Sequence, residues 1–211
     1  DLSAHAWIPI GHISSYFSGT FDGNNKIISN VKIGSSTEPN TINPHVGFFG
    51  LANQATLKNI VLNNAVIYSA NSYASGLLVG ECHNSSIDNC HVAGNINVTD
   101  PLDPTLIGGF SGHSNYSDLL HCSSSVTLNC NGLAYPESTY IGKFLGAAYS
   151  GSVSHCNAEA VLAGDISSYD LELIGRATDT YLAYDSLFDK TPIIPVGDIY
   201  TVSSAEELAW V

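Results

Sequence analysis

Short apolar segments alternate with polar turns along most of the chain. Four of these segments have an apolar centre bracketed by glycines, at residues 46–50, 75–80, 107–112 and 141–146. A second apolar segment follows each of them, at residues 57–62, 87–92, 119–122 and 153–156. Segments this short, rich in Val, Ile, Leu and Phe and bounded by Asn, Ser, Asp and Gly, predict β-strands joined by turns.

The spacing between the paired segments repeats. Each bracketing glycine precedes a core position by ten residues, in the pairs Gly50 and Ile60, Gly80 and Cys90, Gly112 and Cys122, Gly146 and Cys156. The path back to the next glycine lengthens from 20 to 22 and then 24 residues. Stacked coils require such a pattern, because their strands stay in register while an outer loop lengthens freely.

A parallel solenoid is therefore the expected architecture. Repeated glycines would each cost about 1 kcal/mol in a helix interior, whereas they permit close backbone approach between stacked strands. Repeats of about thirty residues that bury their apolar faces against neighbours form solenoids. We expect an all-β, right-handed parallel β-helix of about five coils, with a short C-terminal helical or irregular segment.

The repeat also predicts core and corner positions. Cys90, Cys122 and Cys156 share one repeat position with Ile60, and Val31 lies 29 residues before Ile60, so all five are expected to face the core. His121 and His155 match Asn30, Asn59 and Asn89 at the preceding position, which predicts a polar corner. Pairing of Cys82 with Cys130 depends on the intervening loops.

The repeat weakens near the C-terminus. Ile174 and Gly175 begin like another glycine motif, but the apolar centre is missing after them. Residues 203–209 read as a capping box that opens a helix. We expect the repeat stack to span residues 1–164, and residues 165–211 to hold a degenerate last coil and the start of a following repeat block. The chain is thus expected to be part of a longer polypeptide.

Composition and charge restrict the possible partners. With 44% hydrophobic and 12% charged residues, the chain is too apolar to be disordered. Six Lys and Arg against 19 Asp and Glu give a formal charge of −13, which disfavours nucleic acid as a partner. No apolar run approaches the roughly 18 residues of a membrane-spanning helix, so membrane insertion is not expected.

A family resemblance joins several of these motifs. Trp7-Ile8-Pro9-Ile10-Gly11, then residues 17–25 with their Asp-Gly-Asn-Asn turn, and the later glycine and Asn-Cys units resemble the GLUG-repeat bacterial surface proteins. The resemblance covers roughly residues 1 to 160. It implies a secreted or cell-surface location, in adhesin-like proteins or in regions flanking IgA-specific metallopeptidases. The motifs are specific for the repeat and not for an activity.

Candidate chemistry is sparse. The Cys-His pairs lack the spacing of a zinc site, and no metal site is predicted from them. Asp100 and Asp103 in a proline-bounded turn are the one place considered for Ca²⁺. Asp88 is the one acid expected on a repeated strand, where Lys58, Leu120 and Ser154 match it, so no pair of carboxylates is expected to stack.

The variable return segments are the expected place for ligand contact. They should project from one flank, and they carry Tyr68, Tyr73, Tyr135 and Tyr140 among Asn, Ser and Pro. Tyrosine beside short polar residues suits binding of a host glycan or surface protein. The sequence therefore favours a non-enzymatic adhesin or stalk segment. The alternative is a carbohydrate-active enzyme or a non-catalytic region of a secreted IgA-specific metallopeptidase.

Overall fold

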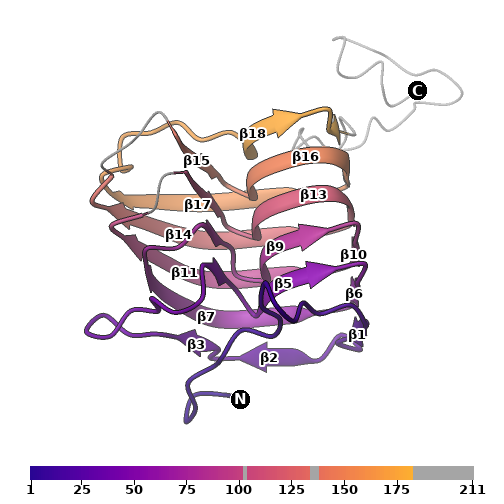
Figure 1. Ribbon diagram of the computed structural model, residues 1–211, viewed down its shortest axis with the longest axis horizontal. Helices are drawn as coiled ribbons and strands as arrows, with labels where there is room; N and C mark the ends of the chain where they lie inside the picture. Colours follow the sequence, from indigo (N-terminus) through magenta and orange to yellow (C-terminus); the bar gives the residue numbers. More distant parts are fainter. Residues whose placement is uncertain (102–103, 134–137, 183–211) are drawn as a thin grey trace, which may run out of the picture.

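The computed structural model describes residues 1–101, 104–133 and 138–182, and it shows a parallel β-solenoid of about five turns (Figure 1). Every pairing between strands is parallel, as expected for coils that wind in one direction. The N-terminal segment lies at one end of the stack and the last described strands lie at the other. In the described part of the chain, no helix is long and apolar enough to cross a membrane.

Three sheets form the sides of the solenoid. Sheet 1 contains β1 (Thr20–Asp22), β5 (Phe49–Asn53), β6 (Thr56–Lys58), β9 (Val79–His83), β10 (Ser86–Asp88), β13 (Ser111–Leu120), β16 (Leu145–Ser154), β18 (Ile174–Thr178) and β19 (Tyr181–Leu182). Sheet 2 contains β2 (Ile27–Ser29), β3 (Lys32–Ile33), β7 (Val61–Ala70), β11 (His91–Thr99), β14 (Ser123–Asn131) and β17 (Asn157–Gly164). Sheet 3 contains β4 (His45–Val46), β8 (Ala74–Ser75), β12 (Thr105–Gly108) and β15 (Thr139–Gly142).

Each coil visits the three sheets in the same order. A short strand of sheet 3 leads through a glycine turn into sheet 1, which bends midway, and the chain then crosses into sheet 2. In the upper coils the two arms of sheet 1 merge, so that β13 pairs with both β9 and β10. The return segments, expected to be projecting loops, are largely the long strands of sheet 2.

The glycines at the start of sheet 1 explain the four bracketed motifs. Gly50, Gly80, Gly112 and Gly146 occupy equivalent positions between paired residues of β5, β9, β13 and β16. A Cβ atom on Gly80 would lie 2.5 Å from the backbone nitrogen of Val46 and 2.8 Å from the Gly50 carbonyl oxygen. Sheet 3 therefore packs backbone against backbone on sheet 1, and only glycine leaves the room.

A column of small apolar side chains runs through the core below the Asn corner. This cysteine column consists of Ile60, Cys90, Cys122 and Cys156, all at most 1% exposed. Consecutive members are linked coil to coil, since the residue after each donates a backbone N–H to the carbonyl of the member below. Burial, followed by the neighbouring thiols, raises the pKa of Cys122 well above its usual value, so it stays a neutral packing group.

The first coil departs from the expected register. Lys32 pairs with Val66, so Val31 is buried beside Ala65 and does not belong to the cysteine column. Asn30 likewise meets Asn64, whose Nδ2 donates to its Oδ1 over 2.6 Å. The prediction from a 29-residue offset was wrong here, because a turn with extra residues between β1 and β2 shifts the first coil by 34 residues relative to the second.

The polar corner exists and uses left-handed backbone. Asn59, Asn89, His121 and His155 have φ between 51° and 55°, and Asn25 occupies the equivalent place in the first coil with φ of 55°. Asn89 donates from Nδ2 to Oδ1 of both Asn59 (2.8 Å) and Asn25 (3.1 Å). Short polar side chains tolerate this conformation because they can bond locally.

The two ends of the stack differ. At the N-terminal end Trp7 stacks on Phe48 with ring centroids 4.4 Å apart, and Phe17 and Phe21 pack on Phe49, which closes the core. At the other end β18 and β19 pair with β16, so described residues beyond 164 still belong to the stack. The expected boundary at residue 164 stays a prediction. The helix predicted at 203–209 lies outside the described residues.

Candidate functional site

A buried carboxylate with three histidines lies where sheets 1 and 3 meet. In this Glu81 cluster, Oε2 of Glu81 lies 2.7 Å from Nε2 of His45, and Oε1 lies 2.8 Å from Nε2 of His83 and 2.9 Å from Nδ1 of His113. The side chains of Glu81 and His45 are only 9% and 6% exposed. Because an ionised carboxylate only accepts hydrogen bonds, each imidazole donates from the named nitrogen.

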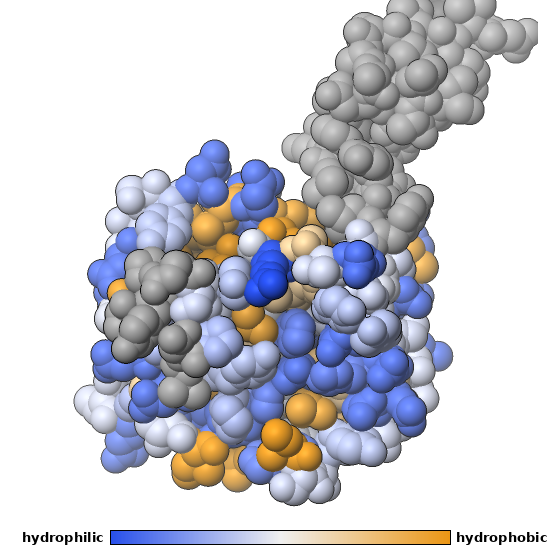
Figure 2. All heavy atoms as spheres, turned by 45° about the horizontal axis from the view of Figure 1, so that its top comes forward, coloured by the Kyte–Doolittle hydropathy of each residue, from blue (hydrophilic) through white to orange (hydrophobic). Residues whose placement is uncertain are grey.

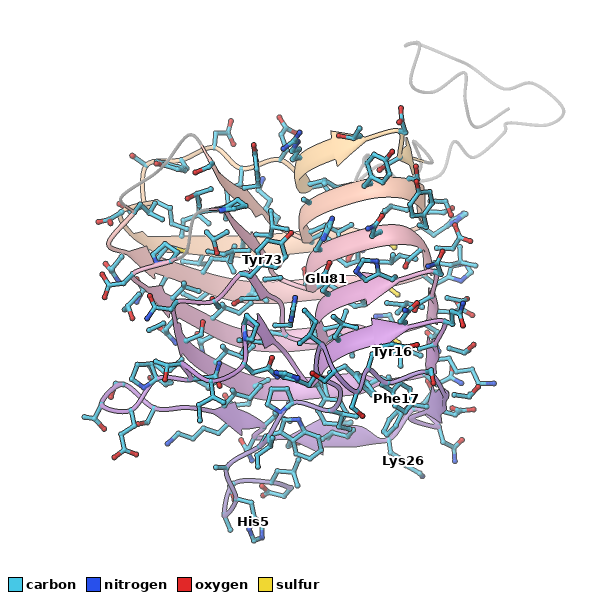
Figure 3. The ribbon with its side chains drawn as sticks, in the orientation of Figure 1. His5, Tyr16, Phe17, Lys26, Tyr73 and Glu81 are labelled. Carbon is cyan, nitrogen blue, oxygen red and sulfur yellow. The ribbon has the colours of Figure 1, made fainter. Side chains whose placement is uncertain are left out.

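Three strands of three coils supply the cluster. Glu81 and His83 stand two residues apart on β9 and thus on one face of it, and His113 is the direct partner of Glu81 on β13. His45 comes from β4 of the preceding coil. The ring of Tyr73 meets the ring of His45 edge to face at 5.7 Å, and Glu81 and Tyr73 are seen together at the centre of the solenoid face in Figure 3.

The surroundings decide the charge of Glu81. Burial by itself raises the pKa of its carboxyl, but hydrogen bonds from His113, His45 and His83 outweigh burial and hold the pKa well below its usual range. Burial, followed by the charge of Glu81, raises the pKa of the Tyr73 hydroxyl. At neutral pH the cluster therefore holds a carboxylate anion beside a neutral phenol.

The cluster also retains unused hydrogen-bonding capacity. Nδ1 of His45 and Oδ1 of Asn53 and of Asn115 are buried and have no hydrogen-bond partner among the described residues. Asn53 and Asn115 are the direct partners of His83 on either side in sheet 1. Unsatisfied buried polar atoms are uncommon in folded proteins, so this seam differs from the rest of the core.

Sequence reasoning missed the Glu81 cluster. Asp88 was expected to be the one acid on a repeated strand, and this was wrong, because Glu81 follows Gly80 directly on β9. The signal was present in the alternation of Glu81 and His83, with His113 at the matching position of the next coil. The predicted partners of Asp88, in contrast, are the ones observed: Lys58 and Leu120 pair with it, and Ser154 pairs with Leu120.

Two of the predicted ligand tyrosines share an apolar patch near the Glu81 cluster. Tyr73 and Tyr140 are half-buried and pack on Ala74, Leu106 and Ala147. At the upper end of this patch Nη1 of Arg176 donates to the Tyr140 hydroxyl at 3.0 Å, and its guanidinium carbon lies 4.9 Å from the centre of that ring. The structure thus brings these two tyrosines to one seam.

Tyr68 lies elsewhere, in a separate groove of about 410 Å³ on the outer side of sheet 2. The other side chains that line the groove are mainly short and polar, with Lys32 the charged one. We call this the Tyr68 groove, and its lining residues are Ser3, Asn30, Val31, Lys32, Ser35, Ser36, Asn64, Val66 and Tyr68. The four predicted tyrosines therefore do not form a single site, and Tyr135 lies outside the described residues.

The remaining candidates can be placed briefly. Asp100 sits at a corner with φ of 46°, where its N–H donates to the Asn131 carbonyl, and Asp103 lies outside the described residues. Cys82 and Cys130 are both buried free thiols, and burial raises the pKa of Cys130 to about 12. Within the residues that the structure describes, no group of three or more His, Cys, Asp or Glu side chains is arranged to hold a metal ion.

Fold and site together define an all-β parallel solenoid with a buried carboxylate–histidine cluster on one seam and a polar groove on another side. Comparisons with family models, with curated proteins and with solved structures find no match for this chain.

Proposed function

We propose that this chain is a non-enzymatic module of an extracellular or cell-surface bacterial protein, an adhesin or stalk segment of a longer polypeptide. In this role the stacked coils hold neighbouring parts of the polypeptide apart, and the outer faces contact a host glycan or surface protein. The resemblance of the sequence motifs to GLUG-repeat surface proteins supports the proposal.

The observation that carries the proposal is the unbroken coil-to-coil register. Glycine columns let sheet 3 lie directly on sheet 1, and the partners of β9, β13 and β16 continue without a shift through these coils. Each further coil advances the chain along the axis by about 4.8 Å, the spacing of hydrogen-bonded strands. A stack that grows in equal steps is suited to act as a stiff spacer.

The outer surface also fits this role. The face in Figure 2, where sheets 1 and 3 meet, is mostly hydrophilic with small apolar patches. Outward positions of sheet 2 carry Asn95, Asn97, Thr127 and Asn129, which are neutral hydrogen-bonding groups. Such a surface offers hydrogen bonds to a ligand without a strong charge requirement.

The alternative, a carbohydrate-active enzyme or a peptidase-associated region, would have to use the Glu81 cluster. A glycosidase needs one carboxyl that stays protonated as a general acid and a second carboxylate. Glu81 is held ionised, and both of its oxygens accept bonds from histidines. Its geometry is that of a structural crosslink between three coils, which favours the adhesin or stalk role.

The test uses beads coated with the purified chain, presented to epithelial cells and to immobilised glycans and serum proteins. Saturable adhesion with no release of sugar or peptide products is the expected result. Release of reducing ends from a polysaccharide, or cleavage of immunoglobulin A, would instead favour the enzyme alternative. Beads coated with heat-unfolded chain control for adhesion that does not depend on the fold.

A further inference from the structure

We infer that the Tyr68 groove is a binding site for an uncharged oligosaccharide, with the Tyr68 ring as its aromatic platform. This inference rests on the proposed function and names the ligand class and the place of contact. The groove has the size of an ordinary small-ligand site, which is about 300 to 1,000 Å³. Its volume of about 410 Å³ suits a few sugar rings lying across sheet 2.

The wall of the groove is held in place before a ligand arrives. Asn40 in the loop after β3 donates its backbone N–H to the Tyr68 carbonyl at 2.8 Å, and Ala70 donates back to the Asn40 carbonyl at 2.9 Å. Within the loop, Glu38 donates its N–H to Oγ of Ser35 at 3.0 Å. A wall fixed by backbone bonds limits the entropy lost on binding.

The loop can reach Tyr68 because of one glycine. Gly34 has φ of +66°, and a Cβ at that position would lie 2.5 Å from the Tyr68 carbonyl oxygen. The loop extends beyond the stack at the left of β3 in Figure 1 and forms the outer rim there. On the opposite side the Asn64–Asn30 hydrogen bond closes the groove.

The chemistry of the lining selects the ligand. Asn30 and Asn64 offer amide donors and acceptors, Ser35 and Ser36 offer hydroxyls, and none of the lining residues is acidic. These groups match the alternating donors and acceptors of sugar hydroxyls, and a tyrosine ring suits the apolar face of a sugar. With Lys32 as the single cation, the groove lacks the converging charges that a phosphate or sulfate ligand would need.

The surface above the groove continues the same chemistry. Asn97 pairs with Tyr68 in the next coil, and Asn129 pairs with Asn97 in the one after. The Nδ2 of Asn129 donates to Oδ1 of Asn97 at 3.3 Å, so the amides are aligned along the axis. A longer saccharide can extend over these amides from the groove.

A peptide ligand fits less well. Peptides commonly bind such folds by adding a strand to a free sheet edge. The edge next to the groove is already covered, because Leu2 donates its N–H to the Ser29 carbonyl at 2.9 Å and Trp7 donates to the Lys32 carbonyl at 2.7 Å. The N-terminal segment therefore occupies the place that a peptide strand would take.

The experiment is a screen of the folded chain on an array of neutral and acidic oligosaccharides, followed by titration calorimetry with the best neutral binder. Tyr68→Ala is expected to weaken binding at least about tenfold, since it removes the stacking platform. Ser36→Trp should block the groove and abolish binding while leaving Tyr68 intact. Thr37→Trp, on the neighbouring exposed position, and Tyr140→Ala, on the other seam, are matched controls expected to bind normally.

Three outcomes overturn the inference: no saccharide binding by the wild-type chain, binding of acidic saccharides alone, or binding that Tyr68→Ala and Ser36→Trp leave unchanged. Bead adhesion separates this result from the proposed function. If adhesion persists in Tyr68→Ala, the adhesin role stands and the groove is wrong as its contact site. If the groove binds saccharide and the beads do not adhere to any surface, the groove stands and the adhesin role fails.

Discussion

The cysteine column and the Glu81 cluster are two buried regions built across neighbouring coils by opposite means. The column places similar small side chains at one repeated position, so each coil adds an equal layer of apolar packing. The cluster joins four ionisable side chains that each occur once, at non-equivalent places in three coils. Repetition therefore builds the scaffold, whereas departures from the repeat build the place with distinctive chemistry.

The glycine column that underlies both regions should be the least tolerant to change. Gly80→Ala places a Cβ 2.5 Å from the Val46 backbone nitrogen, so sheet 3 has to separate from sheet 1. We expect a loss of about 4 kcal/mol or more of unfolding free energy, or failure to fold. Urea denaturation followed by circular dichroism measures this loss.

The matched control is Gly19→Ala, where the new Cβ meets only the end of the Phe17 ring at 3.3 Å. This variant should lose less than about 1 kcal/mol. Equal losses for Gly80 and Gly19 would show that backbone packing between sheets 1 and 3 does not hold the coils together.

The Glu81 cluster should follow in sensitivity. Glu81→Gln keeps the shape but removes the charge that three imidazoles share, and we expect a loss of about 3 kcal/mol at pH 7. Asp88→Asn is the control, because Asp88 contacts His121 at 3.2 Å where both side chains are at least half exposed. Removal of that exposed pair should change stability by less than about 0.5 kcal/mol.

The same pair of proteins gives a pH test. The pKa of Glu81 is lowered by folding, so its contribution is fully present above about pH 4.5, the ordinary value, and is lost progressively as the pH falls below it. The stability difference between wild type and Glu81→Gln should therefore be larger at pH 7 than at pH 3. A difference that grows toward acid pH would contradict the lowered pKa.

The cysteine column should tolerate apolar exchange and resist polar exchange. Cys122→Val places a β-branched apolar residue where Ile60 already stands in another coil, and should cost less than about 1.5 kcal/mol. Cys122→Ser buries a hydroxyl among apolar neighbours and should cost about 2 kcal/mol. Thermal unfolding of the two variants ranks them, and the reverse order would argue against a packing role.

The polar corner should show the smallest effect. Asn89 has φ of 51°, so Asn89→Ala forces an ordinary residue into left-handed backbone and removes two amide bonds, at a cost of about 1 to 2 kcal/mol. Asn89→Gly restores the conformational freedom and should recover part of that loss. Chemical denaturation of both variants checks the order, and an Ala variant as stable as the Gly variant would refute the strain argument.

Much of the architecture was predictable because it depends on short-range spacing. The ten-residue offset between Gly80 and Cys90 is the length of one bend of sheet 1 and its corner, so the same distance recurs in each coil. Parallel stacking then follows, since only equivalent positions of successive coils can share a buried column. The corner residues Asn59 and Asn89 were also readable from their turn chemistry.

Tertiary structure decided the register of the first coil and the composition of both candidate sites. The turn between β1 and β2 moved Val31 out of the column, because added turn residues shift every later partner along the strand. His45 meets Glu81 only because sheet 3 folds back over the glycines of sheet 1. The sequence by itself determined a stack of parallel coils through local spacing, whereas contacts between non-equivalent positions depend on how the sheets pack, which no repeat interval encodes.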